Sequence, residues 1–242
     1  MALDVYVGSL TRYYLGDWET PIQRYARESG KQVLRVEVAN KGESNSDDVI
    51  KDPEIVRSYV ISWRNALNTA LGEYLSCPLD WDETSTAPYF SEQLRWDNLS
   101  SLKLWAAYLE HPDLIRPNNC VVDWTKDVAF KRIVEDPSKT KYPNLLKDPT
   151  TWLPADFKPL VFETEEANGH TTTFGSVAGL KDELDEINEL TWKADKATIE
   201  KWKRDSTAPS APLEEGARFG FALLSVLSSI ALERKLVMRL DG

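Results

Sequence analysis

The hydrophobic positions of the chain follow two different periods, and the contrast predicts where strands and helices lie. Residues 3–10 carry a run of β-branched and aromatic side chains that predicts a first strand. Residues 32–38 alternate polar and apolar side chains, as a half-buried strand does. Two further runs, 159–165 and 170–177, are joined by a segment that ends in Asn-Gly. Because these two residues accept positive φ, the pattern predicts a hairpin.

Elsewhere apolar residues recur at spacings of three and four, which is the period of an amphipathic helix. The clearest case follows Asp52 and Pro53, which are typical of an N-cap and a first turn. The apolar run 219–232 holds about 14 residues, fewer than the roughly 20 that span a bilayer, and therefore predicts a buried helix. The expected helices cover residues 20–29, 53–74, 91–110, 125–134, 178–191 and 212–235.

The order of these elements is strand, helix, strand, several helices, hairpin and helices. Strands and helices alternate too irregularly for a doubly wound parallel sheet. We therefore expect a helix-rich α+β fold with a small mixed or antiparallel sheet covered by several helices. No internal repeat divides the chain, and we expect residues 1–242 to form a single domain.

Composition supports a folded protein and limits the class of partner. Hydrophobic residues make up 42% of the 242 residues and charged residues 28%, which is ordinary for a globular protein. The formal net charge is −10. Such a charge disfavours nucleic-acid binding, which requires a basic face, and favours a basic protein partner. The negative charge is concentrated in residues 73–97 and 163–189, which together carry −12.

Few residues suit metal or cofactor chemistry. The two cysteines form no CxxC pair, and the chain has only two histidines. The usual glycine-rich phosphate loops, the GxSxG nucleophile elbow and the HExxH zinc motif are missing from the sequence. We expect no metal and no cofactor, and we leave open whether the protein is an enzyme. The first residues lack the features of a secretory signal, so we expect a cytoplasmic protein without a membrane span.

One candidate site is the segment after the first predicted strand. Arg12 is a candidate for holding an anionic or polar group, and Asp17 or Glu19 is a weak candidate for a catalytic acid or base. Neighbouring aromatic residues can enclose such a ligand. The same residues also fit a structural role, in which an ion pair and packed aromatics close the end of the strand.

A second candidate site consists of the acidic stretches. Acidic residues beside aromatic ones, within a charged rim, are typical of tight protein interfaces. The alternative is that the acids form only the solvated face of an amphipathic helix. The residues concerned are Asp80, Trp81, Asp82, Glu83, Asp182, Glu183, Asp185, Glu186 and Glu189.

The opening sequence, LDVYVGSLTRYY followed by GDWE, resembles the start of a family of uncharacterised bacterial proteins of similar length. The resemblance covers under a tenth of the chain and implies no particular activity. The predicted hairpin, followed by Phe-Gly-Ser and a leucine-rich acidic helix, is similar in pattern to several bacterial toxin-immunity proteins.

The first functional hypothesis is a cytoplasmic protein-binding inhibitor, an immunity protein that neutralises a basic bacterial toxin through an acidic surface containing aromatic residues. The alternative is an enzyme or small-ligand binder that uses Arg12, Asp17 and Glu19. A third hypothesis is a structural component that forms a stable homo-oligomer.

Overall fold

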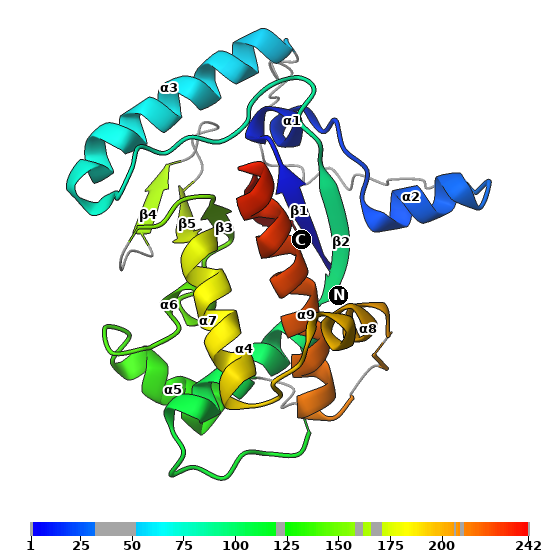
Figure 1. Cartoon of the computed structure of the whole chain (residues 1–242), viewed down its shortest axis with the longest axis vertical. Helices are drawn as coiled ribbons and strands as arrows, with labels where there is room; N and C mark the ends of the chain where they lie inside the picture. The colour runs from blue at the N-terminus through cyan, green and yellow to red at the C-terminus, as the bar shows by residue number, and fades with distance from the viewer. Residues whose placement is uncertain are drawn as a thin grey trace, which may run out of the picture.

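Within the residues that the structure describes, the protein forms a six-stranded mixed sheet with helices on both faces (Figure 1). The strand order is β2-β1-β6-β3-β5-β4; β3 and β5 run parallel and the other neighbours antiparallel. The computed structural model describes residues 2–31, 52–119, 124–157, 162–165, 171–205, 207–208 and 211–241. The expected helix-rich α+β class is confirmed.

The elements in chain order are β1 (Ala2–Gly8), α1 (Leu10–Leu15), α2 (Pro21–Glu28), α3 (Pro53–Leu71), η1 (Gly72–Tyr74), β2 (Phe90–Arg95), α4 (Trp96–Glu110), η2 (Trp124–Lys126), α5 (Val128–Glu135), α6 (Pro143–Leu146), β3 (Thr151–Leu153), β4 (Phe162–Glu165), β5 (Thr171–Ser176), α7 (Val177–Leu190), α8 (Lys196–Arg204), α9 (Leu213–Arg234) and β6 (Val237–Asp241).

The sheet separates two hydrophobic cores because successive strand residues point to opposite faces. In β6, Met238 belongs to the first core and its neighbour Val237 to the second. Helices α4, α7 and α9 cover the first core, and α3 covers the second. Figure 1 shows α3 across one side of the sheet, with α7 and α9 on the other.

Helix α9 is the central element of the first core and packs against α4, α7 and α8. By length and composition it could cross a membrane, but 61% of its apolar window is buried inside the protein. The expected buried helix is therefore confirmed, and the fold is compatible with a soluble protein. Gly220 allows α4 to approach closely, since a Cβ there would lie 2.8 Å from the backbone oxygen of Asn98.

Several predicted elements agree with the structure. Helix 20–29 is α2, helix 53–74 is α3 followed by η1, and the hairpin strands are β4 and β5, which pair antiparallel. The turn of this hairpin and the predicted strand 32–38 lie outside the described residues.

The predicted helix 91–110 is wrong at its start. Residues 90–95 form β2, which pairs with β1 from Ala2↔Arg95 to Val7↔Phe90, and α4 begins only at Trp96. Ser91 and Leu94 are both buried and lie on opposite faces of the strand, so buried positions three residues apart imitate the spacing of a helix. Strand β6 was not predicted, although it lies between β1 and β3. It holds five residues and depends on its two neighbours for every ladder bond.

Replacing Gly220 with Ala tests the close packing of α4 and α9. Overpacking against a backbone oxygen costs about 1–3 kcal/mol, which is expected to exceed the roughly 1 kcal/mol that Ala gains in helix propensity. Urea denaturation should therefore show a lower free energy of unfolding. Gly72→Ala is the control, because a Cβ there meets nothing within 4 Å and the backbone is helical. It should stabilise the protein, and destabilisation by both variants alike would contradict the packing argument.

Candidate binding groove

A loop of residues 79–84 is tied to three different elements and forms one wall of a groove. On the α3 side, the Asn68 side-chain amide donates to the Leu79 carbonyl at 3.1 Å, and its oxygen accepts the Leu79 N–H at 2.6 Å. On the α9 side, the Asp82 N–H donates to the Lys235 carbonyl at 2.9 Å. These bonds fix the backbone of the loop on either side of Trp81.

The third attachment is the buried carboxylate of Glu83 at the start of α1. One oxygen accepts the Leu10 N–H at 2.9 Å and the Trp81 indole N–H at 2.6 Å, and the other accepts the Thr11 N–H at 2.9 Å. First-turn N–H groups have no partner within their own helix, and a carboxylate suits the positive end of the helix dipole. Glu83 is 5% exposed, so its carboxylate interacts with groups inside the protein and not with solvent.

The groove has a volume of about 390 Å³ and lies between α3, this loop and the C-terminal end of α9. Figure 1 shows the end of α9 on the side of the molecule where α1 and α3 lie. On α3, Arg57, Ile61 and Arg64 share one face because they are four and three residues apart. The groove is lined by Arg57, Ile61, Arg64, Asp80, Trp81, Asp82, Glu83, Thr84, Arg234 and Lys235.

Basic side chains dominate the charge of the groove. Arg64 donates to the Trp81 carbonyl at 2.7 Å and lies 5.3 Å from the Trp81 ring centre, so it is fixed against the loop. Asp80 lies 3.5 Å from Arg64 and 3.7 Å from Lys235. With Glu83 used at α1, four cations line the groove against the two remaining carboxylates of Asp80 and Asp82.

Two of the arginines that line the groove have a guanidinium nitrogen without a hydrogen-bond partner among the described residues. The Nε atoms of Arg57 and Arg64 are shielded from solvent and hydrogen-bond to no described residue. An unpaired buried N–H costs about 1–3 kcal/mol, so native structures rarely keep one without a reason. Both arginines line the groove.

The four predicted contact residues 80–83 therefore lie together in one loop, but they do not form an exposed acidic surface. Asp80 is exposed and Asp82 half-buried, whereas Trp81 is 2% exposed and Glu83 is internal. Trp81 and Glu83 cannot contact a partner directly. The basic residues of the groove were not predicted from the sequence: Arg57, Arg64, Arg234 and Lys235. Their one local signal is the two-turn spacing of Arg57 and Arg64.

The second acidic stretch is on α7, whose apolar residues pack into the first core, on the opposite face of the sheet from α3. Asp182, Asp185, Glu186 and Glu189 are exposed. Glu183 is 6% exposed and therefore cannot be a contact residue.

The Glu183 carboxylate instead holds the first turn of α6. It accepts the Asn144 N–H and side-chain amide, both at 2.8 Å, and the Leu145 N–H at 2.9 Å. Burial raises the pKa of the Glu183 carboxyl to about 8, and the three N–H donors, which favour the anion, oppose this rise.

The segment after β1 uses its charged residues within the protein. Arg12 lies 3.3 Å from Asp17, donates to the Ser85 carbonyl at 3.3 Å and is 5.1 Å from the Tyr89 ring centre. Arg12, Asp17 and Glu19 line neither this groove nor a cavity of about 210 Å³ at α8 and α9. The structural interpretation of this segment accounts for these contacts.

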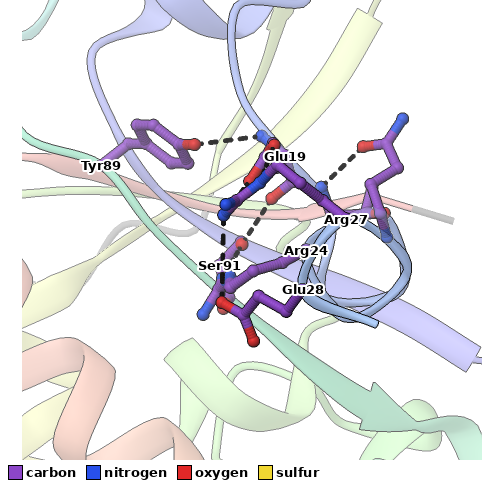
Figure 2. A network of polar contacts seen from close by, with 8 residues as sticks. Glu19, Arg24, Arg27, Glu28, Tyr89 and Ser91 are labelled. Atoms are coloured by element: carbon purple, nitrogen blue, oxygen red, sulfur yellow. Dashed lines mark hydrogen bonds and ion pairs between the residues drawn. The ribbon is translucent and has the colours of Figure 1, made fainter. Parts of the chain in front are cut away.

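Glu19 belongs to the network that holds α2 beside the edge strand β2 (Figure 2). Its carboxylate accepts two bonds from Arg27, at 2.8 and 3.1 Å, and its carbonyl accepts the Ser91 hydroxyl at 2.6 Å. Arg24 donates to the Ser91 carbonyl, and the Glu19 N–H donates to the Tyr89 hydroxyl. The Glu19 carboxylate therefore fixes a helix, and both of its oxygens are occupied.

Replacing Glu83 with Gln tests the attachment of the loop to α1. Gln offers one acceptor oxygen to three N–H donors, so we expect the free energy of unfolding to fall by about 1–3 kcal/mol in urea denaturation at pH 7. Glu73→Gln, at an exposed position in η1, should change it by less than about 0.5 kcal/mol. Equal effects of the two variants would show that Glu83 does not have this role.

Replacing Glu183 with Gln tests the raised pKa. Because the folded pKa of about 8 exceeds the reference value of 4.5, this carboxyl stabilises the fold fully below pH 4.5 and loses that contribution as the pH rises towards 8. In Glu183→Gln the decline in unfolding free energy over this window should be smaller, by an amount on the order of a few kcal/mol.

Denaturation at several pH values measures this slope. A lost hydrogen bond in Glu183→Gln shifts the whole curve but leaves its slope unchanged. Glu186→Gln, at an exposed position of the same helix, should keep the wild-type slope. Parallel curves for wild type and Glu183→Gln would contradict the raised pKa.

No family model, no curated protein and no solved structure matches this chain.

Proposed function

We propose that the protein is a protein-binding inhibitor of the immunity type, which neutralises a basic partner by covering it with an acidic surface. The observation that carries this proposal is the exposed face of α7. Asp182, Asp185, Glu186 and Glu189 point to solvent there, while Leu180, Leu184 and Ile187 anchor the helix in the first core. A rigid helix thus presents several negative charges on one surface.

Part of this charge has no counterpart within the described residues. Lys181 pairs with Asp185, and Lys193 lies 3.8 Å from Glu189, but Asp182 and Glu186 form no ion pair with a described residue. Uncompensated charge attracts a partner of opposite sign and increases the rate of association. A basic protein is the partner that suits this face, in a chain whose net charge is −10.

The alternative function, an enzyme or ligand binder at the segment after β1, has less support. Arg12, Asp17 and Glu19 already pair within the protein, with Asp17, Arg12 and Arg27 as their respective partners. A ligand there would have to replace existing contacts. The groove beside α3 offers a small ligand four cationic side chains instead.

The test is affinity purification of the tagged protein from its native host, with mass spectrometry of the proteins that co-purify. The α7 variant carries Asp182→Asn, Asp185→Asn, Glu186→Gln and Glu189→Gln. We expect wild type to retain a basic partner at low salt and to release it at moderate salt, because exposed charges are screened. The α7 variant should retain at least about tenfold less of it, equivalent to a loss of about 1.4 kcal/mol.

The matched control removes four exposed acids elsewhere and so changes the net charge equally: Glu28→Gln, Glu54→Gln, Glu73→Gln and Glu233→Gln. It should retain the partner as wild type does. Equal loss in both variants would show a general charge effect and not a site on α7. A protein that purifies alone, or only as a homo-oligomer, would contradict the inhibitor proposal.

A further inference from the structure

We propose that the groove between α3, the 79–84 loop and the end of α9 is a binding site for a small molecule with a phosphate or carboxylate group. This site is separate from the α7 face and does not depend on the proposed inhibitor function. Helix α3, which forms its wall, packs on the opposite face of the sheet from α7.

The charge of the groove differs from that of the whole chain. The protein carries −10, yet Arg57, Arg64, Arg234 and Lys235 all line this one cavity. Their ion pairs within the protein are long. Arg57 lies 3.7 Å from Glu54, and Arg234 lies 3.6 Å from Glu233, so neither cation is strongly neutralised. An anion in the groove would meet two cations from α3 and two from the end of α9.

Two arginines of the groove also have an N–H group without a partner among the described residues. The Nε atoms of Arg57 and Arg64 are shielded from water and lack a partner among the described residues. They project from one face of α3, seven residues and therefore about two turns apart. Guanidinium groups bind phosphate and carboxylate oxygens through such N–H donors, often two at a time.

The left-handed backbone conformation of Lys235 is a further argument that its cation has a role in the groove. Lys235 ends α9 with φ 51°, in the left-handed region where glycine or asparagine usually closes a helix. A side chain at this position strains the backbone, and strained residues are concentrated at binding sites. The lysine side chain is 67% exposed, so packing in a core does not explain its presence.

The second cavity of the described residues does not share these features. It measures about 210 Å³ and contains Arg218, whose Nε is also unpaired. Glu214 pairs with the Arg218 guanidinium, and Asp205 and Glu215 line the same cavity. Acids outnumber the single arginine there, so an anion would be repelled.

The size and rim of the groove restrict the ligand further. A cavity of about 390 Å³ lies in the range of small-molecule sites. Asp80 and Asp82 remain as acceptors beside the four cations. They suit hydroxyl or amino groups on the same molecule and would repel a ligand that is anionic throughout. The expected class is therefore a small hydroxylated or aminated phosphate or carboxylate.

Isothermal titration calorimetry with three probes tests this proposal on the full chain. Glycerol phosphate supplies a phosphate with hydroxyls, malate supplies carboxylates with a hydroxyl, and glycerol is the neutral control. We expect wild type to bind one equivalent of glycerol phosphate or malate and not to bind glycerol. A preference for one anion supports the site and identifies which acid group it takes.

The matched variants are Arg57→Gln and Arg204→Gln. Arg57→Gln should weaken binding of the preferred anion at least about tenfold, since it removes a charge and an unpaired donor. Arg204 is exposed on α8 and lines neither cavity, so Arg204→Gln should bind as wild type does. Thermal unfolding verifies that both variants are folded.

Two results would overturn the proposal. One is the lack of measurable heat for both anions with wild type, up to concentrations of about 10 mM. This result would limit the favourable free energy of binding to a few kcal/mol. The other is equal binding by Arg57→Gln and Arg204→Gln. Lys235→Gly provides an independent readout, because it removes a cation while relieving the backbone; weaker anion binding by a more stable protein supports the site.

Discussion

The carboxylate of Glu83 is the contact on which the arrangement of the groove depends. It joins the 79–84 loop to the first turn of α1 through Leu10 and Thr11, and it also holds the Trp81 indole. The loop then lies within reach of Asn68 on α3 and of the Lys235 carbonyl after α9. One buried acid thus attaches to α1 the loop that lines the cavity together with α3 and the end of α9.

The same contact changes the electrostatic character of the segment. As a sequence, residues 80–83 carry three acids and no base. In the fold, Glu83 is occupied by N–H donors and Asp80 lies near Arg64 and Lys235, so the basic side chains outnumber the free acids. The acidic surface of the protein lies instead on α7, across the sheet. The proposed protein-binding face and the proposed anion site therefore lie on opposite faces of the sheet.

The sequence predicted elements whose pattern is local and missed those that depend on distant partners. Helix α3 buries one stripe of residues and α9 buries most of its surface, so the spacing of apolar residues was sufficient to predict both helices. Strand β6 has five residues and takes its ladder bonds from β1 and β3, so its own sequence did not reveal it. Strand β2 depends in the same way on its pairing with β1, and its residues were predicted to be helical. The role of a charged side chain also depends on distant residues, because the two backbone N–H donors of Glu83 lie 72 and 73 residues away. No count of nearby acids could show that Glu83 and Glu183 are internal.

The most direct test of the central claim is a crystal structure of the protein grown with glycerol phosphate. The claim is that the attached loop leaves a positive groove with two unpaired arginine donors. It predicts a phosphate within hydrogen-bond distance of the Arg57 or Arg64 guanidinium, with Glu83 still bonded to the start of α1. A groove that holds only water at saturating ligand, or Nε atoms that donate to protein acceptors, would contradict it.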